Sequence, residues 1–485
     1  MAHIKSIWTG VIDFFSDPLC ERNKEKIDGY FKGRGYLATV CFIVLAGHLT
    51  GLEYYFNIVN MLLFCSALLL TDSIRPAVTF ACTVTFQITR GHVPGYPGYS
   101  SYYFDGAKLW ILIGLTVIMA ACVVRFIIVN RVFAGLNFKR TPLLLSLSLL
   151  SLSFMLAGAF APGWRPGDLL HGFCQAATYC FIFLVFYGSF KKEKGEDALS
   201  FYTYLSSMMA IILVVQAIFL YLTGGVIEGG SIIKERIHFG WGIWTTAGIY
   251  FATLIPSVFI GVIREKHPVF YFVLATLTLF GAVLTLSRNA ILFGGAAYAA
   301  CVLICCFKGN NKKLFRIVAA AGLVLAMLAA VLMWDKITLV LKDLFDRGLS
   351  DNGRFKLWAM GIENFLKAPL FGNGYYSLEV TENVVITTHF LPKMAHNTIV
   401  QILSSMGVAG ICAYGFYRYK TLIPFLKRPT AAKTVLLISV LVLLGGSLLD
   451  NFIFRFYNIF HYSAALAIAF RLYEDEQDEI RVESI

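Results

Sequence analysis

The chain has 485 residues, of which 58% are hydrophobic and only 14% are charged. Soluble proteins carry roughly 25% charged residues, so this composition excludes a soluble enzyme, a nucleic-acid-binding protein and a disordered scaffold. The net charge of +12 indicates either basic cytoplasmic loops or a site for an anionic substrate. The apolar runs are long and continuous, which favours an all-α polytopic membrane protein over a membrane β-barrel.

The N-terminal segment, residues 1–35, mixes apolar, polar and basic side chains. This mixture predicts an amphipathic helix that lies in the membrane surface on the cytoplasmic side. The segment lacks the uninterrupted apolar core of a cleavable signal peptide.

Fourteen apolar runs follow, and a membrane-spanning helix needs roughly 20 such residues. We expect eleven spans within residues 36–334 and three more within residues 396–473. The expected spans lie at about 36–52, 54–71, 74–90, 107–129, 141–161, 169–190, 199–223, 239–263, 268–286, 290–307, 314–334, 398–418, 432–449 and 453–472.

Basic residues alternate between the links that connect these spans. The even-numbered links and the N-terminus hold most of the Lys and Arg, whereas the short odd-numbered links hold few. Cytoplasmic loops of membrane proteins collect Lys and Arg. The alternation therefore predicts an even number of spans and two cytoplasmic termini, including the acidic tail 474–485.

One link, residues 335–395, is much longer than the others and falls on the non-cytoplasmic face. A loop of this length is usually functional or has structure of its own. We expect two amphipathic helices inside it, at 337–347 and 353–368, the second capped by Asp351 or Asn352.

Four groups of residues on the non-cytoplasmic face are candidates for chemistry. They are Lys234, Arg236 and His238; Ser287-Arg288-Asn289; Asn352-Gly353-Arg354; and Ala395-His396-Asn397. Arg288 lies between two apolar runs, where a cation is costly unless paired, so it either snorkels to the interface or clamps an anion. Arg354 lies in the first turn of a predicted helix, where a cation opposes the helix dipole. It is either an exposed loop arginine or binds an anion together with the free backbone N–H groups.

His396 is the best candidate for a general base, because histidine changes charge near neutral pH. The alternative is a histidine that only makes interfacial hydrogen bonds. Glu53, at the first outer turn, is a second candidate base, although a lone interfacial carboxylate would look the same. Asp343 and Asp346 are spaced as the solvated face of a helix rather than as a metal site.

Together these residues suit the transfer of a sugar from a lipid diphosphate. The diphosphate leaves as an anion, so arginines can stabilise the developing charge while one base activates the acceptor hydroxyl. Such a reaction needs no metal and no other cofactor.

The same residues fall in ordered motifs that resemble the O-antigen polymerase and O-antigen ligase superfamily. The motifs are Arg236-Ile-His-Phe-Gly240; Leu284-Thr-Leu-Ser-Arg288-Asn-Ala290; Gly353-Arg354 with Trp358 and Pro369-Leu-Phe-Gly372-Asn-Gly374; and Ala395-His396-Asn397 with Gln401 and Gly407-Val-Ala-Gly410. The resemblance covers roughly residues 230–415. The first two hundred residues share only their serial apolar spans.

The resemblance implies a GT-C-like helical glycosyltransferase, independent of metals and nucleotide sugars, whose donor glycan is carried on undecaprenyl diphosphate. It would work at the outer face of the bacterial cytoplasmic (inner) membrane. Arg288 and Arg354 would bind the diphosphate, and His396 would be the catalytic base. Arg236 is a weaker donor-binding candidate, because the sequence after it departs from the Pro-Asn of many members. The supporting residues would be Asn289, Asn397 and Gln401.

The leading hypothesis is a polymerase that joins lipid-linked repeat units into O-antigen, capsule or exopolysaccharide, with a chain-length regulator protein as a candidate partner. The alternative within the superfamily is an O-antigen ligase, which transfers the glycan to a lipid A core; an acceptor on a protein is a third option. A flippase for lipid-linked oligosaccharides is the alternative from another class. Transporters tend to have two related halves, and the sequence has no such repeat.

Overall fold

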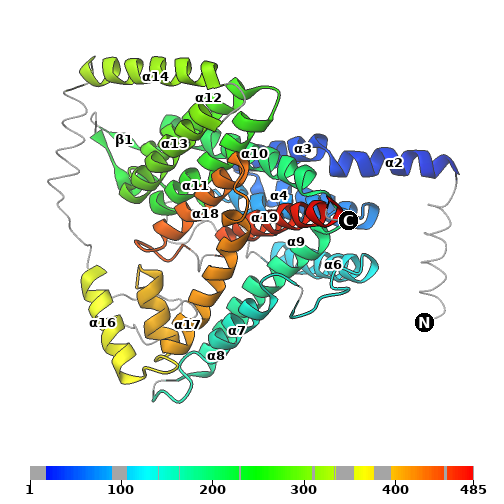
Figure 1. The fold of residues 1–485 in the computed structure, drawn as a ribbon, viewed down its shortest axis with the longest axis vertical. Helices are drawn as coiled ribbons and strands as arrows, with labels where there is room; N and C mark the ends of the chain where they lie inside the picture. The colour runs from blue at the N-terminus through cyan, green and yellow to red at the C-terminus, as the bar shows by residue number, and fades with distance from the viewer. Residues whose placement is uncertain are drawn as a thin grey trace. The chain divides into compact units, whose positions relative to one another are not determined.

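The computed structural model describes residues 18–89, 106–139, 141–162, 164–228, 231–308, 312–332, 334, 354–375, 395–452 and 456–483. These residues are helical apart from turns, links and one short hairpin, as expected for an all-α polytopic membrane protein. The chain divides into two compact units, Met1–Gly135 with Val185–Ala247 and Leu136–Leu184 with Gly248–Ile485. Each unit is described by itself below (Figure 1).

In the first unit, helix α3 packs against α4 and α10. An ion pair between Arg75 and Glu193 (2.8 Å) joins α5 to the residues that precede α10. The elements of this unit are α2 (Pro18–Lys32), α3 (Arg34–Thr50), α4 (Glu53–Leu70), α5 (Arg75–Thr83), η1 (Val84–Gln87), α6 (Ala107–Val129), α10 (Gly195–Thr223), β1 (Ile227–Glu228), β2 (Ser231–Ile232) and η4 (Lys234–Arg236).

In the second unit, α17 packs against α7 and α16, and α13 packs against α12, α14 and α18. Helices α9 (Ile182–Phe190) and α11 (Trp244–Arg264) contain residues of both units. The other elements are α7 (Leu144–Met155), α8 (Pro166–Ala176), the π-helical turn η3 (Ala177–Phe181), α12 (Pro268–Leu284), α13 (Arg288–Lys308), α14 (Lys312–Leu332), α16 (Arg354–Lys367), α17 (Thr398–Leu426), α18 (Ala431–Gly446) and α19 (Phe456–Glu483).

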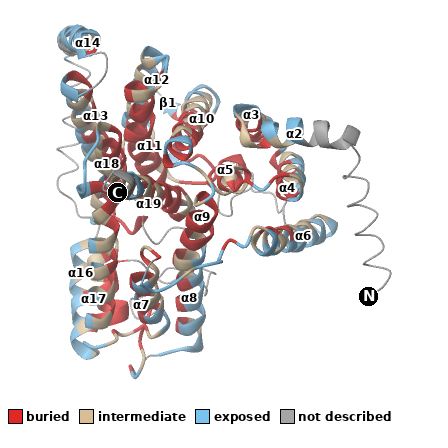
Figure 2. Cartoon of the chain, turned by 45° about the vertical axis from the view of Figure 1, so that its right-hand side comes forward, coloured by how far each residue is buried: buried red, intermediate tan, exposed pale blue. Residues whose placement is uncertain are grey.

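Seven helices among the described residues are long and apolar enough to cross a membrane, and the bent pair Glu25–Lys32 and Arg34–Thr50 would make an eighth. They differ greatly in burial: the apolar window of α11 is 94% buried, whereas that of α6 is 11% buried (Figure 2). A helix that is apolar on all sides and buried forms the core of a bundle, and one that exposes its apolar side chains suits contact with lipid. The seven are Glu53–Leu70, Ala107–Val129, Pro166–Phe190, Gly195–Thr223, Trp244–Arg264, Arg288–Lys308 and Thr398–Leu426.

The fourteen spans expected from the apolar runs are not confirmed. The run 74–90 forms α5, of nine residues, followed by the 3₁₀ helix η1, of four. The rise of about 14 Å for α5 and about 8 Å for η1 falls short of the roughly 30 Å hydrocarbon core. The run 141–161 forms only the 12-residue helix α7. An apolar run measures composition, whereas the length of a helix also depends on its caps and on the packing around it.

The long link 335–395 is described only in part. Helix α16 (Arg354–Lys367) confirms the helix predicted at 353–368. The helix expected at 337–347, and the caps Asp351 and Asn352, lie outside the described residues. Residues 1–17 of the expected N-terminal amphipathic helix also lie outside them, and α2 covers the part that follows.

Helix α17 is broken where the residues that follow α16 pack against it. Gly407 has a φ of 63° and interrupts the helix. The N–H groups that follow it donate to the link: Val408 N–H to Pro369 O (2.8 Å) and Ala409 N–H to Leu370 O (3.1 Å). These hydrogen bonds hold the residues that follow α16 against α17.

Candidate active site

The loop before α17 holds His396 in an uncommon backbone conformation. Its φ of 51° lies in the left-handed region that residues other than glycine seldom adopt. The neighbouring residue Ala395 is fixed on both sides: its N–H donates to Gln401 Oε1 (2.8 Å), and its carbonyl oxygen accepts from Trp358 Nε1 (2.9 Å). Such backbone strain persists only where the surroundings over-determine it, and it clusters at functional sites.

His396 pairs with a buried acid, Asp450. Nδ1 of the imidazole lies 3.1 Å from Asp450 Oδ1, and the histidine side chain is 40% exposed while that of the aspartate is 5% exposed. An ionised carboxylate only accepts hydrogen bonds, so the pair places the proton of the neutral imidazole on Nδ1 and leaves Nε2 able to accept one. A base oriented in this way by an acid is the arrangement used to deprotonate a hydroxyl.

Asp450 is the residue that the sequence analysis missed. The signal was present, because Asp450 and Asn451 interrupt the apolar sequence between the runs 432–449 and 453–472, and an ionisable residue between membrane segments marks function by default. The next residue, Asn451, connects Asp450 to Gln401. Its N–H donates to Asp450 Oδ1 (2.7 Å), and its Nδ2 donates to Gln401 Oε1 (3.1 Å).

The turn between α18 and α19 gathers the segments that carry the other candidates. Residues 446–448 of this turn offer three successive carbonyl oxygens to other segments. Their donors are Asn289 Nδ2 to Gly446 (3.1 Å), Thr398 N–H to Ser447 (3.0 Å) and Asn397 Nδ2 to Leu448 (2.9 Å). The start of α13 and the start of α17 are therefore fixed to one turn, which continues into Asp450.

Arg288 and Arg354 are the first residues of α13 and α16. Helix α13 is bonded to the turn before Asp450, and α16 is bonded to the residue before His396. Arg288 is the exposed first residue of α13, and the next residue, Asn289, is bonded to the turn. Arg354 is the half-buried first residue of α16, and the indole of Trp358, one helical turn later, binds the carbonyl next to His396. The structure thus brings together three segments that are far apart in the sequence. Because helix N-termini favour anions, the arrangement suits a substrate that carries phosphate.

Two of the three amides expected to support the site, Asn397 and Gln401, are occupied by protein contacts on both side-chain atoms. Asn397 Oδ1 caps α17 by accepting from Ile399 N–H (2.9 Å) and Val400 N–H (3.1 Å). Gln401 Nε2 donates to Ser405 Oγ (2.9 Å), in addition to the two bonds that its Oε1 accepts. These side chains therefore fix the chain on both sides of His396, at Ala395 and at the start of α17.

Two further candidates, Arg236 and Glu53, belong to the first unit. The Arg236 guanidinium binds Glu228 Oε2 and the Gly225 carbonyl oxygen, both at 2.8 Å, and so closes the β1–β2 hairpin. Glu53 is fully buried at the start of α4 and accepts from the N–H (3.3 Å) and hydroxyl (2.7 Å) of Thr89. It is a buried, hydrogen-bonded carboxylate rather than a lone interfacial one.

A family model described as O-antigen ligase matches residues 271–415. The match confirms the resemblance to the O-antigen ligase and polymerase superfamily, and it includes Arg288, Arg354 and His396 but begins after Arg236. It supports a function of O-antigen ligase or polymerase type and does not support the flippase alternative. No curated protein matches the chain.

Proposed function

Starting from the match to the O-antigen ligase family, we propose that the chain is a membrane glycosyltransferase that polymerises glycan repeat units carried on undecaprenyl diphosphate. The observation that carries the proposal is the His396–Asp450 pair (3.1 Å). Asn289, next to Arg288, is bonded to the turn that leads to Asp450, and Trp358, four residues after Arg354, is bonded to Ala395. The pair supplies a base, and the two arginines supply cations for a leaving diphosphate.

In the proposed reaction, an acceptor hydroxyl oxygen attacks the anomeric carbon of the donor glycan. His396 Nε2 takes the hydroxyl proton, and the carboxylate of Asp450 stabilises the imidazolium that forms. The bond from the anomeric carbon to the diphosphate oxygen breaks, and its electron pair stays on that oxygen. Arg288 and Arg354, with the N–H groups at the starts of α13 and α16, stabilise the negative charge. No metal takes part in these steps.

The acceptor distinguishes the two enzymes of this superfamily. In the polymerase it is a hydroxyl of a second lipid-linked unit, and in the ligase it is a lipid A core. The matching family is described as O-antigen ligase, so we keep the ligase as the second candidate. In both cases we place the protein in the bacterial inner membrane, with cytoplasmic termini and with His396 on the outer face.

The test uses purified protein, one undecaprenyl-diphosphate-linked repeat unit as the only substrate, and EDTA, with the products read by mass. A ladder of longer lipid-linked glycans is the result expected of a metal-independent polymerase. An unchanged donor, together with transfer to an added lipid A core, would instead identify a ligase. Products that disappear when EDTA is added would contradict metal independence, and no product with either acceptor would contradict glycosyl transfer.

A further inference from the structure

A cavity of about 330 Å³ lies in the first unit, where α3 and α10 end. Its lining also includes Thr89, which follows η1, and His238 and Phe239, which follow η4. Within the described part of the chain, the residues that line it include no Lys, Arg, Asp or Glu. Ligand pockets usually have volumes of about 300–1,000 Å³, so this cavity has room for one small ligand.

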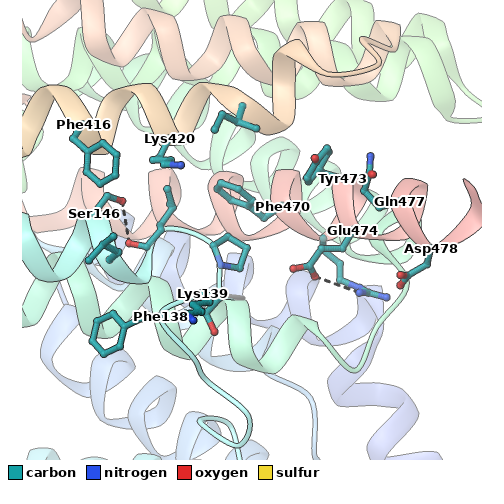
Figure 3. A pocket seen from close by; sticks show the side chains of 16 residues that line it. Phe138, Lys139, Ser146, Phe416, Lys420, Phe470, Tyr473, Glu474, Gln477 and Asp478 are labelled. Carbon is teal, nitrogen blue, oxygen red and sulfur yellow. Dashed lines mark hydrogen bonds and ion pairs between the residues drawn. The ribbon is translucent and has the colours of Figure 1, made fainter. Parts of the chain in front are cut away.

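The larger cavity of the second unit, of about 950 Å³, has a different lining. Figure 3 shows basic side chains, such as Lys420, and acidic side chains, such as Glu474 and Asp478, around the same space. Glu474 pairs with Arg471, which belongs to the same lining (3.5 Å). Charges of both signs that already interact with the protein do not select one kind of ligand, whereas a charge-free lining excludes whole classes of ligand.

The smaller cavity offers an ion no counter-charge, because its described lining carries only uncharged side chains. Burying an ionised group costs free energy unless the group is paired, so both a phosphate and an ammonium group are disfavoured there. The polar side chains of the lining bear hydroxyl and imidazole groups, and Phe219 and Phe239 contribute phenyl rings. Such a lining suits a ligand that is uncharged and rich in hydrogen-bonding groups.

Two threonine hydroxyls of the lining have already donated their hydrogens to the protein. Thr50 Oγ1 donates to Ala46 O (2.6 Å), and Thr223 Oγ1 donates to Phe219 O (2.7 Å). Thr50 Oγ1 also accepts from Leu52 N–H (3.3 Å). A hydroxyl oxygen has two lone pairs, so each of these oxygens retains at least one with which to accept from a ligand. Both threonines are exposed residues.

His48 adds a third acceptor, in the buried part of the lining. The backbone at Phe86 and Ile88 bonds to its imidazole. Its Nδ1 is buried and has no hydrogen-bond partner among the described residues, so those bonds belong to Nε2. Backbone carbonyl oxygens accept, which places the proton of the neutral ring on Nε2 and makes Nδ1 an acceptor. A ligand hydroxyl that donates to Nδ1 would remove the cost of a buried unpaired atom.

The cavity wall is ordered by the protein itself. His238 Nδ1 accepts from Gly240 N–H (2.9 Å), and Thr89 Oγ1 donates to Glu53 Oε1 (2.7 Å). The ring of Phe239 packs against that of Trp241, with 5.5 Å between the ring centres. A wall that is built before the ligand arrives lowers the ordering cost of binding.

The cavity lies at the ends of the apolar runs 36–52, 74–90 and 199–223. These ends lead into odd-numbered links, which hold few basic residues and which the positive-inside rule places on the non-cytoplasmic face. Under the function proposed above, this face carries the glycan substrates.

We propose that this cavity binds one uncharged sugar residue. The sugar hydroxyls donate to His48 Nδ1, Thr50 Oγ1 and Thr223 Oγ1, and the C–H groups of the ring contact Phe219 and Phe239. The sugar assignment rests on the proposed function, which brings glycans to this face. It concerns residues of the first unit, and no covalent bond forms or breaks there.

The test is saturation-transfer-difference NMR of the full-length protein in a detergent without a sugar headgroup. The probes are the methyl glycosides of glucose, galactose, mannose and N-acetylglucosamine, each titrated separately. We expect at least one to bind, and we expect Thr50→Val with Thr223→Val to raise its Kd about fivefold or more, because valine keeps the shape of threonine but accepts no hydrogen bond.

The matched control is Thr39→Val with Thr116→Val, which removes two hydroxyls that donate within their own helices in the same unit. Size-exclusion chromatography verifies that both double variants fold. Equal Kd values for the two double variants, or no saturation transfer from any of the glycosides, would overturn the sugar assignment. Stronger binding of ethanolamine than of the glycosides would overturn it as well, by identifying a cation site.

The sugar site and the proposed function fail separately. A protein that binds a glycoside but gives no product with either acceptor keeps the sugar site and contradicts glycosyl transfer. A protein that transfers glycan but binds no glycoside keeps the proposed function and overturns the sugar site.

Discussion

The His396 loop in the second unit and the β1–β2 hairpin beside Arg236 in the first unit both involve residues that the sequence marked as candidates, but these residues are held differently. Around His396, the side chains of Trp358 and Gln401 fix the backbone of Ala395, and the buried Asp450 sets the direction of the imidazole. At the hairpin, the Arg236 guanidinium is bonded to Glu228 and to the Gly225 carbonyl oxygen. The first arrangement orients a partly exposed imidazole and suits chemistry, whereas the second uses the side chain to close the hairpin.

This comparison predicts its largest effect at His396. His396→Ala removes the proposed base and should reduce transfer by about 10²–10⁴-fold, because the acceptor hydroxyl then keeps its proton during attack. Binding of a fluorescent donor lipid should change little, since the base is not a donor ligand. His267→Ala, which alters an exposed histidine at the start of α12, is the control. Substantial turnover of His396→Ala at pH 7 would refute the base assignment.

Asp450→Asn should have the next largest effect, about 10²-fold on the transfer rate, because an amide does not fix the tautomer of His396 or stabilise its charged form. The rate should fall while donor affinity is retained, and the pH–rate profile should shift, which a merely structural role would not produce. Asp72→Asn, at an ion pair with Lys32 in the first unit, is the control. An unchanged pH profile would remove Asp450 from the mechanism.

Arg288→Ala should weaken donor binding and transfer together by about 10–100-fold, the equivalent of one charged hydrogen bond. Arg288→Lys should restore little, because an ammonium does not reproduce a bidentate contact. Titration of the fluorescent donor against each variant provides the measurement, with the exposed residue Arg131 changed to Ala as the control. Donor affinity and rate that both match the wild type would remove Arg288 from the diphosphate site.

The smallest expected effect on transfer comes from Gly407→Ala, which acts through the fold. The added methyl group would overlap the carbonyl oxygen of Pro369 at a residue with positive φ, at a cost of about 1–3 kcal/mol. We expect a lower Tm and a few-fold slower transfer, because the break in α17 anchors the chain next to the His396 loop. Gly415→Ala is the matched control on the same helix, since nothing lies within 4 Å of its Cβ position. Equal Tm values for the two variants would contradict this role of the break.

The candidate residues within the matching region were predictable because short motifs carry them. His396 lies in Ala395-His396-Asn397, and Arg354 lies at the start of an amphipathic pattern that forms α16 as expected. Periodicity over fourteen residues is a local property, so tertiary contacts were not needed to find this helix.

The sequence by itself determined the membrane class, the helical composition and the identity of His396, Arg288 and Arg354 as candidates, because these follow from composition and local pattern. Only the tertiary structure decided that Asp450, 54 residues after His396, orients the imidazole. It also decided that the run 74–90 forms a nine-residue α-helix followed by a 3₁₀ helix, and that the Asn397 and Gln401 side chains bond to other residues of the protein. These outcomes depend on contacts between residues distant in the sequence, where burial and hydrogen bonding override local preference.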